Sequence, residues 1–525
     1  MRVFSLVVLL CGAFRAVAVA ESKDRHVVVI VWDGMRRDFI TEKLAPTLHA
    51  LAQRGVFFQN HHPVFLSTTE VNGTALATGA YPEHSHIIAN QEFRYGISTN
   101  KPVGTESLDA IRKGDRLIGG HYLEVPTVAE ILQAHGLRTV VAGSKPVALL
   151  QDRSERTNFN GGAVLFEGRT LPPALQATLT NALGLFPPTS VTKTNRDNWT
   201  TRALVEELWR DGVPSFTLLW LAEPDYSQHG TSPGSEQSLA SIRNSDRNLA
   251  RVIEALKSKG VYDQTDIFVV SDHGFSTVGH GVDVAAVLNK NGFNAVRQYE
   301  NKPAPGEILI VNGATTLLYV AGHDPETSAR LVRFLQTQEF TGVIFSRQSM
   351  EGAFALEDAH INSPEAPDVV FTMRWTHTRN RSGTAGMENI EAETPIVDGQ
   401  AKATPQESKS EKGTHGTLSP YDLRNTLVAA GPDFRAGFAD RLPSGNTDVA
   451  PTVLWLLGIE PPRSMDGRVL SEALNIDGPK TAAPKSEKLE ASRHDGRLIW
   501  RQYLKRTELN GMVYLDEGNG EVSGP

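Results

Sequence analysis

Several runs of apolar residues along the chain have the length and composition of buried β-strands. The first, Val27–Trp32, contains β-branched residues at all but its last position and shows no alternation between apolar and polar residues. A strand buried on both faces has this pattern, which is typical of parallel sheets. Comparable runs follow at Leu137–Ala142, Phe216–Ala222, Ile267–Val270 and Leu427–Pro432.

Segments with helical spacing lie between these runs. Pro46–Gly55 is typical, because proline is favoured at the first position of a helix and glycine just after its last turn. The others are Glu70–Thr78, Thr127–His135, Leu239–Leu256 and Asp448–Leu457. Strands that alternate with helices predict an α/β fold with a largely parallel central sheet between helices. A chain of 525 residues suits one large α/β domain with insertions.

The same pattern divides the chain into five parts. These are a leader at 1–20, the first part of the core at 21–278, a small inserted αβ subdomain at 279–365, the second part of the core at 366–480, and a C-terminal linker and hairpin at 481–525. Residues 379–412 are polar and lack apolar periodicity, so we expect a partly ordered flap there. Near the C-terminus, Lys480–Glu490 resembles a surface linker, and Asn510-Gly511 is a strong hairpin signal.

The first twenty residues have the pattern of a secretory signal peptide. A basic start at Met1-Arg2 is followed by a short apolar stretch and by Ala18-Val19-Ala20, a typical cleavage site. A membrane anchor is the alternative, but the stretch is short and Arg15 interrupts it. We therefore expect a secreted or periplasmic protein without a stable membrane anchor. Cleavage would also remove Cys11, the single cysteine, so any metal ligands must be histidines and carboxylates.

The charge balance narrows the class of partner. The chain has 52 basic and 60 acidic residues, without the clustered lysine and arginine that a nucleic-acid polymer requires. A small phosphorylated substrate is compatible with this balance if the binding site itself supplies local positive charge.

Acidic residues and histidines follow the ends of three predicted strands. Because the carboxyl ends of parallel strands meet at one edge of a sheet, we expect these side chains to converge. They are Asp33, Asp225 with His229, and Asp272 with His273, and His415 joins them after the predicted flap. Three aspartates and three histidines suit two Zn²⁺ ions with mixed oxygen and nitrogen ligands. Two metals about 4 Å apart can stabilise phosphoryl transfer.

Thr69 is the candidate nucleophile of such a site. It lies at the start of a predicted helix, where the helix dipole favours an anion, and metal coordination would lower the pKa of its hydroxyl. Attack on phosphorus would give a phospho-Thr69 intermediate. Asn72 lies about one helical turn further on, so its amide could donate to a phosphate oxygen. Taken singly, these residues have commoner uses, Thr69 as a helix cap and Asp33-Gly34 as a turn.

The series of motifs resembles the alkaline phosphatase superfamily, and within it the type I phosphodiesterase/nucleotide pyrophosphatase family. The motifs are Val31-Trp32-Asp33-Gly34, Thr69-Glu70-Val71-Asn72, Glu223-Pro224-Asp225-Tyr226-Ser227-Gln228-His229-Gly230, Ser271-Asp272-His273-Gly274 and Gly413-Thr414-His415-Gly416. The resemblance implies an alkaline-phosphatase-like fold and a zinc-dependent hydrolase of phosphate diesters or pyrophosphates. It also implies that one zinc ion is bound by Asp33, Thr69, Asp272 and His273. A second zinc would be bound by Asp225, His229 and His415, and Asn72 would contact the substrate phosphate.

The segment around Thr69 departs from the usual family pattern. Thr68 replaces a lysine, Glu70-Val71 replaces Phe-Pro, and Gly73 replaces a histidine. Thr69 and Asn72 persist, so we expect the chemistry to persist with an altered nucleoside pocket. The alternatives of similar chemistry are a phosphomonoesterase or phosphonate hydrolase, and a mutase, which the leader disfavours. An alternative of another class is a metal-binding pseudoenzyme, which the complete set of site residues disfavours.

Overall fold

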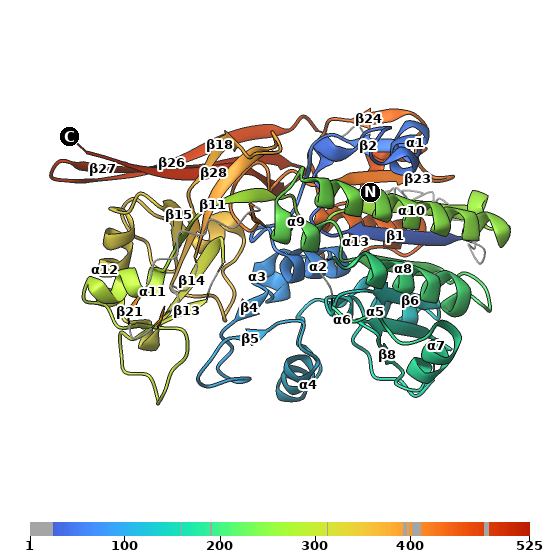
Figure 1. Cartoon of the computed structure of the whole chain (residues 1–525), viewed down its shortest axis with the longest axis horizontal. Helices are drawn as coiled ribbons and strands as arrows, with labels where there is room; N and C mark the ends of the chain where they lie inside the picture. The colour runs from blue at the N-terminus through green and yellow to red at the C-terminus, as the bar shows by residue number, and fades with distance from the viewer. Residues whose placement is uncertain are drawn as a thin grey trace, which may run out of the picture.

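A computed structural model of the chain describes residues 25–391, 396–397, 400–401, 411–476 and 482–524, apart from 159, 190, 191 and 312. A nine-stranded mixed sheet forms its centre (Figure 1). In spatial order, its strands are β24 (Phe438–Asp440), β2 (Val56–Phe58), β23 (Leu427–Ala430), β10 (Thr265–Val270), β1 (His26–Trp32), β9 (Phe216–Leu221), β6 (Thr139–Gly143), β7 (Gly162–Phe166) and β8 (Arg169–Leu171). The predicted leader, 1–20, lies outside the described residues.

The five strands from β10 to β7 are all parallel, as the apolar runs predict. Strand β1 lies between β10 and β9, and Val27–Trp32 is buried on both faces. Antiparallel pairing joins β10 to β23 on one side and β7 to β8 on the other. The carboxyl ends of β10, β1 and β9 therefore lie next to one another.

Helices cover both faces of the sheet, and two apolar clusters fill the space between them. On one face, Val29 and Val31 pack in a cluster with residues of α2 (Thr69–Thr78), α5 (Val128–Ala134) and α13 (Asn446–Leu456). On the other face, Val28 and Ile30 pack with α1 (Pro46–Arg54), α7 (Leu175–Leu183), α8 (Thr194–Arg202) and α10 (Glu236–Ser258). This arrangement confirms the predicted fold class, and each predicted core helix is present.

A second sheet contains the strands predicted for the insert. Its order is β12 (Ala295–Val296), β13 (Ile308–Val311), β14 (Thr315–Val320), β17 (Val369–Met373), β15 (Thr341–Ser346) and β16 (Phe354–Ala355). Residues of α11 (Val284–Lys290) and α12 (Pro325–Leu335) complete its core. The sheet continues to Met373, eight residues beyond the predicted end of the insert at 365.

The predicted flap is only partly correct as a description of residues 379–412. Residues up to 391 form the antiparallel pair β18 (Trp375–Arg379) and β19 (Ala385–Glu391), which joins β11 (Ser276–Val282) and β22 (Gly413–Thr414) in a four-stranded sheet. Strand β18 was not predicted, because four of its five side chains are polar and exposed. The short pair β20 (Ile396–Val397) and β21 (Gln400–Ala401) follows, and most of the remaining predicted flap lies outside the described residues.

The C-terminal part is a three-stranded antiparallel sheet, drawn in red at the upper left of Figure 1. Strands β27 (Leu498–Leu509) and β28 (Met512–Ser523) are joined by Asn510-Gly511, both with positive φ, as the hairpin signal predicts. The expected linker is wrong from residue 485 onward, because β26 (Lys485–Asp495) pairs with β27 along its whole length. Its mostly exposed polar side chains concealed the strand.

Shorter elements complete the described chain. They are β3 (His61–His62), α3 (Pro82–Ser85), β4 (Gln91–Glu92), β5 (Val103–Gly104), α4 (Leu108–Leu117), α6 (Ala148–Gln151), α9 (Asp225–Thr231) and β25 (Ser444–Gly445), with 3₁₀ or π turns at Arg37–Phe39, Ala203–Leu208, Tyr262–Gln264, Ala321–His323, Leu356–Ala359 and Ser471–Ala473. Among the described residues, none of the helices has the length and apolar character needed to cross a bilayer.

The buried carboxyl of Asp266 on β10 should make stability depend on pH. Burial, opposed by Arg25, raises its pKa to about 7. The protonated carboxyl is thus favoured in the folded state, and its contribution, complete below the unfolded pKa of about 3.9, is lost as the pH rises through 7. Asp266→Asn should therefore gain stability relative to the parent between pH 5 and 8, by roughly 2–4 kcal/mol at pH 8.

Urea unfolding at both pH values measures this gain. Asp263→Asn, at an exposed position of the neighbouring turn, is the control and should show no comparable gain. A gain at Asp266 that does not grow with pH would contradict the assignment.

Candidate metal centre

The candidate site lies where β1, β9 and β10 end. Asp33 directly follows β1, and its carbonyl accepts the Asp225 N–H at 2.9 Å, which ties the first turn of α9 to the end of β1. Gly34 donates its N–H to Asp272 Oδ1 at 3.0 Å. Its φ is +71°, and an added Cβ would lie 2.9 Å from Phe275 and 3.1 Å from Asp225, so a larger residue does not fit. The backbone thus brings the three aspartates together.

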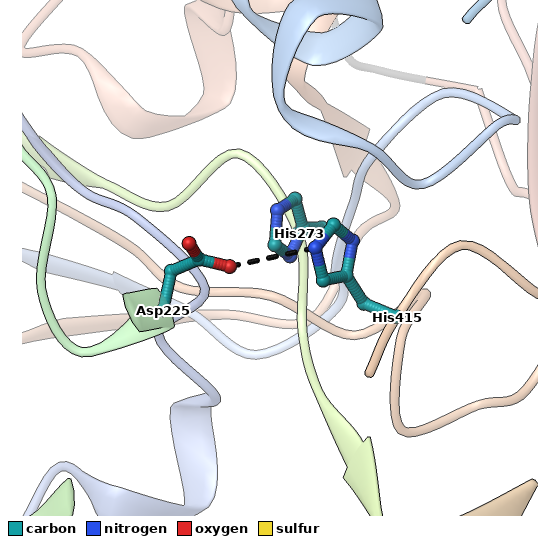
Figure 2. Close-up of side chains that lie close together, drawn as sticks. All are labelled: Asp225, His273 and His415. Atoms are coloured by element: carbon teal, nitrogen blue, oxygen red, sulfur yellow. Dashed lines mark ion pairs between the residues drawn. The ribbon is translucent and has the colours of Figure 1, made fainter. Parts of the chain in front are cut away.

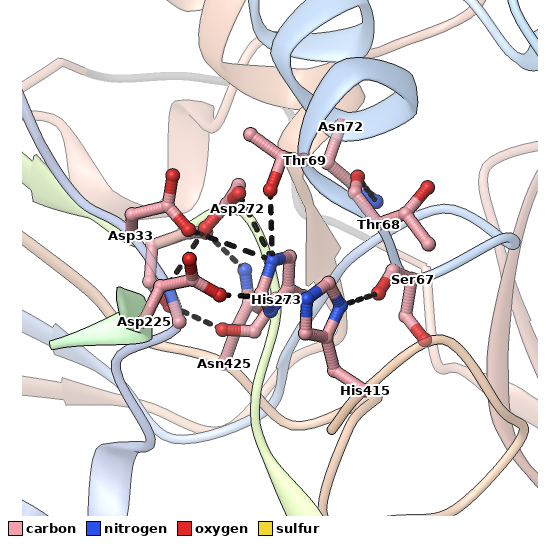
Figure 3. A network of polar contacts seen from close by, with 12 residues as sticks. Asp33, Ser67, Thr68, Thr69, Asn72, Asp225, Asp272, His273, His415 and Asn425 are labelled. Atoms are coloured by element: carbon pink, nitrogen blue, oxygen red, sulfur yellow. Dashed lines mark hydrogen bonds and ion pairs between the residues drawn. The ribbon is translucent and has the colours of Figure 1, made fainter. Parts of the chain in front are cut away.

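One group of potential ligands contains Asp33, Asp272 and His273, whose ligand atoms lie within 4.8 Å of one another. His273 Nε2 is 3.2 Å from Asp272 Oδ2 and 3.6 Å from Asp33 Oδ1. The hydroxyl of Thr69 points toward the same nitrogen, at 3.3 Å (Figure 3). These are the four residues that the family resemblance assigns to one metal.

A second group lies beside the first and contains Asp225, His273 and His415 (Figure 2). Asp225 Oδ1 is 3.4 Å from His415 Nε2 and 3.2 Å from His229 Nε2. The rings of His273 and His415 are stacked, with 3.5 Å between their centroids. All the residues predicted as metal ligands therefore lie in one continuous site. His229 is the exposed member, at 43% of its side chain, and marks the side that faces solvent.

Backbone carbonyls fix the orientation of all three imidazoles. The Nδ1 atoms lie at hydrogen-bonding distance from carbonyl oxygens, His229 from Gly413 at 3.0 Å, His273 from Gly274 at 2.8 Å and His415 from Ser67 at 2.9 Å. An Nδ1–H that donates to a carbonyl leaves Nε2 with its lone pair, the usual state of a metal-bound histidine. Burial lowers the pKa of His273 to about 3 and that of His415 to about 4, so both rings are neutral at pH 7.

Three carboxylate oxygens face these nitrogens without a hydrogen bond from any residue that the structure describes. They are Asp33 Oδ1, Asp225 Oδ1 and Asp272 Oδ2, and all are buried. A buried anionic oxygen without a donor is costly unless a cation lies against it. Three oxygens opposite neutral imidazole nitrogens form a donor set that fits two divalent cations of the zinc type.

Thr69 occupies the first turn of α2, with its side chain buried. Helix α2 has ten residues and ends at Gly79, in the left-handed conformation that favours glycine. The positive end of the helix dipole is therefore directed at the same space as the two ligand groups. This position is suited to a threonine oxygen that carries negative charge during a reaction.

The side chain of Asn72 bonds to backbone groups of the loop before α2, and its contact with phosphate stays a prediction. Its side-chain nitrogen donates to the carbonyls of Val64, Leu66 and Thr68, at 3.0–3.2 Å, and its oxygen accepts the Val64 N–H at 2.8 Å. The side chain is fully buried, and its donors are directed into the loop before α2. Asn72 therefore fixes the loop that precedes Thr69.

Sequence reasoning missed Lys145, whose ammonium lies among the acidic groups of the site. Its Nζ is 2.8 Å from Asp33 Oδ2, 3.0 Å from Asp225 Oδ2 and 3.5 Å from Thr69 Oγ1. Although burial opposes the charge, Asp225 and Asp33 hold the pKa of Lys145 well above its usual value. Lys145 follows β6 by two residues, so the strand-end rule could have found it had basic residues been considered.

Glu70, which stands where the family usually has phenylalanine, gives the wall beside Thr69 a different character. Its side chain is buried, and its N–H donates to Asn90 Oδ1 at 3.2 Å. Burial, and next the charge of Glu106, raises the pKa of Glu70 well above its usual value. The wall beside Thr69 is therefore an acidic pair in place of an aromatic ring.

Comparison with known families identifies the chain. The model of the type I phosphodiesterase/nucleotide pyrophosphatase family matches residues 27–417, which include every predicted metal ligand. The chain belongs to this family. The type I phosphodiesterases and nucleotide pyrophosphatases are hydrolases of phosphoester and phosphoanhydride bonds, and the chain is an enzyme of this class.

Individual relatives of the type I phosphodiesterase family are distant. The bis(5'-adenosyl)-triphosphatase of Xenopus laevis is 21% identical over 461 residues, which cover 87% of this chain and 83% of the relative. Venom phosphodiesterase 2 of Crotalus adamanteus is 22% identical over 48% of this chain, which spans 27% of the venom enzyme. The structure of murine ectonucleotide pyrophosphatase/phosphodiesterase 5, inactive and in complex with AMP, shares the fold. Its TM-score is 0.59 at 18% identity, over 86% of this chain and 100% of that chain.

The hydrogen bonds of Asn72 predict a structural defect when the residue is removed. Asn72→Ala removes the side chain that pairs with the buried N–H and carbonyl of Val64 and one of the donors to the carbonyls of Leu66 and Thr68, which should cost about 1–3 kcal/mol of unfolding free energy. Asn90→Ala, the control, removes one acceptor at the same end of α2 and should cost less. Urea unfolding measures both. A stable Asn72→Ala variant with weakened phosphate affinity would support the predicted contact with substrate.

Proposed function

We propose that the chain is a phosphodiesterase/nucleotide pyrophosphatase that requires two zinc ions and forms a phospho-Thr69 intermediate. The observation that carries the proposal is the position of Thr69 Oγ1, 3.3 Å from His273 Nε2 and beside two groups of potential ligands. Asp33, Thr69, Asp272 and His273 would bind one zinc ion, and Asp225, His229 and His415 the other. Bound zinc would supply a lowered pKa for the threonine hydroxyl and positive charge opposite the phosphoryl oxygens.

Thr69 acts as the nucleophile in the first step. Its deprotonated oxygen forms a bond to phosphorus while the bond from phosphorus to the leaving oxygen breaks. The products are a phospho-Thr69 that keeps the other ester group of the substrate and a free alcohol or phosphate. The threonine proton passes to solvent, and the leaving oxygen takes a proton from water. The N-terminus of α2 stabilises the negative charge on Thr69 Oγ1 and on the phosphoryl group.

Water completes the reaction by attacking the phosphorus of phospho-Thr69 on the side that the leaving group has vacated. The threonine oxygen is released and recovers its proton. His273 and His415 stay neutral, because burial lowers the pKa of His273 to about 3 and that of His415 to about 4. All three histidines donate Nδ1–H to a backbone carbonyl, which fixes the orientation of their rings. Asn72 keeps the loop before α2 in place through both steps.

Nucleotide-like phosphate diesters and pyrophosphates are the substrates that the relatives favour. The relatives include a bis(5'-adenosyl)-triphosphatase and venom phosphodiesterases, and the murine structure contains AMP. The acidic pair of Glu70 and Glu106 would receive the leaving group differently from the aromatic residue usual in the family. Secretion or export to the periplasm is also part of the proposal, because residues 1–20 resemble a signal peptide and similar proteins are named ectonucleotide pyrophosphatases.

Substitution of the nucleophile tests the proposal. Thr69→Ala should reduce hydrolysis of bis-p-nitrophenyl phosphate by at least about a thousandfold, because no oxygen remains to attack phosphorus. The parent protein, quenched in acid during turnover of bis-p-nitrophenyl phosphate, should give a peptide of Thr69 that is heavier by one p-nitrophenyl phosphoryl group, because the second ester group stays on phosphorus. Steady-state rates and peptide mass spectrometry measure these two results.

Thr74→Ala is a matched control on the same helix, since Thr74 donates to the Glu70 carbonyl and is equally buried. It should retain most of the activity, and Thr69→Ala should retain bound zinc by elemental analysis because the other ligands remain. Unchanged turnover in the Thr69→Ala variant would show that Thr69 is not the nucleophile. A protein that hydrolyses p-nitrophenyl phosphate but not bis-p-nitrophenyl phosphate would exclude the proposed phosphodiesterase activity.

A further inference from the structure

The position of Lys145 is fixed by the sheet and by the turn that follows β6. The preceding residue, Ser144, donates its N–H to the Trp220 carbonyl at 3.0 Å, and its hydroxyl lies 2.5 Å from Asp197 Oδ1. Both partners belong to the part of the fold that supports β9 and the segment after it. The side chain of Lys145 then enters the site and is only 14% exposed. The burial and the contacts of Ser144 indicate that the fold holds the ammonium in a defined position.

Lys145 and the histidines face different oxygens of the same carboxylates. The ammonium contacts Oδ2 of Asp33 and Oδ2 of Asp225. The two Oδ1 atoms face His273, His229 and His415, and they accept no hydrogen bond from the described residues. Cations bound by Oδ1 and the histidines would therefore leave the contacts of Lys145 intact. The lysine and the zinc ions can be present together.

The third hydrogen of the ammonium is available for the reacting group. A lysine has three donors, and two of them are taken by Asp33 and Asp225. The remaining direction leads to Thr69 Oγ1, at 3.5 Å. A phosphorus atom poised for attack lies about 3–3.5 Å from its nucleophile. Its non-bridging oxygens would then come within hydrogen-bonding distance of Lys145 Nζ.

Charge matching extends this geometry to the substrate. Three aspartates and Lys145 give the side chains a net charge of −2, so two divalent ions and the deprotonated Thr69 oxygen would bring the reactive centre to +1. A terminal phosphate carries up to two negative charges, whereas a phosphate diester carries one. A fixed ammonium beside the phosphoryl oxygens would therefore stabilise the transfer of a terminal phosphate more than that of a diester.

We propose that Lys145 is a catalytic residue whose ammonium binds a non-bridging phosphoryl oxygen and thereby gives the enzyme a phosphomonoesterase activity beside the diesterase activity. The inference rests on the proposed function of the same site. In the monoester reaction, the bond from Thr69 Oγ1 to phosphorus forms as the bond to the alcohol oxygen breaks. The alcohol takes a proton from water, the threonine proton passes to solvent, and Lys145 keeps its protons throughout.

Lys145→Met tests the inference, because methionine retains the apolar stem and removes the charge. For the zinc-loaded enzyme, kcat/KM for p-nitrophenyl phosphate should fall by about a hundredfold, and that for bis-p-nitrophenyl phosphate by about tenfold or less. The inhibition constant of orthovanadate should rise by about the same factor as kcat/KM for the monoester falls. The zinc content of the variant should equal that of the parent. Lys145→Arg, which keeps the charge, should recover part of the monoester activity.

Lys257→Met is the matched control, because Lys257 pairs with Glu254 on the exposed side of α10 and should show no effect. An equal loss for both substrates, or a loss of zinc, would overturn the inference and leave Lys145 as a support for the carboxylates.

A second test measures inhibition of the unmodified enzyme and does not depend on the folding of a variant. Inorganic phosphate should inhibit at least about tenfold more strongly than dimethyl phosphate, and equal inhibition would overturn the inference. A parent protein that hydrolyses neither ester would refute the proposed function itself.

Discussion

The convergence of three buried aspartates at one edge of the central sheet is the constraint on which the site depends. Two unit charges of like sign at 4 Å repel by about 4 kcal/mol at an effective dielectric constant of 20. The fold nevertheless holds Asp33, Asp225 and Asp272 together through backbone hydrogen bonds such as those of Gly34 and Asp225. Burial, and next the charge of Asp272, raises the pKa of Asp33 well above its usual value, and burial raises that of Asp272 to about 7, so the fully ionised cluster needs cations to balance it. Lys145 provides one positive charge, and the unpartnered oxygens are arranged for others.

The elements around this cluster make its geometry specific. Three histidines receive their orientation from carbonyls at separate places in the chain, so Nε2 of each ring is directed inward before any ligand binds. The loop before α2 is held by Asn72, which places Thr69 at the positive end of a helix. Preorganisation of this kind lowers the cost of reaching a charged transition state, because few groups must move. The chemistry therefore depends on residues that do not touch the substrate.

Much of this architecture could be predicted from local patterns, and the failures have physical causes. The parallel centre of the sheet was predictable because strands such as Val27–Trp32 are buried on both faces and leave an uninterrupted apolar run. Strands β18 and β26 were not, because their side chains are mainly polar and exposed and resemble loops. Exposed strands depend on neighbours that lie far away in sequence, and no local signal reports them.

Some residues of the site could likewise be predicted from the sequence, and others could not. Its aspartates and histidines were predictable because they follow strand ends, where side chains of parallel strands must meet. The role of Asn72 was not, because proximity to Thr69 along a helix does not reveal that its amide is occupied by Val64, Leu66 and Thr68. Lys145 was overlooked because a search for metal ligands passes over a cation. Its importance appears only when the distances to Asp33 and Asp225 are known.

Anomalous diffraction at the zinc edge from crystals of the mature protein tests the central claim most directly. The account predicts two peaks about 4 Å apart. One should lie against Asp33 Oδ1, Asp272 Oδ2 and His273 Nε2, and the other against Asp225 Oδ1, His229 Nε2 and His415 Nε2. Lys145 should remain on the opposite carboxylate oxygens. A zinc-loaded protein that binds its metal elsewhere, or in which only one peak appears at these residues, would contradict the account.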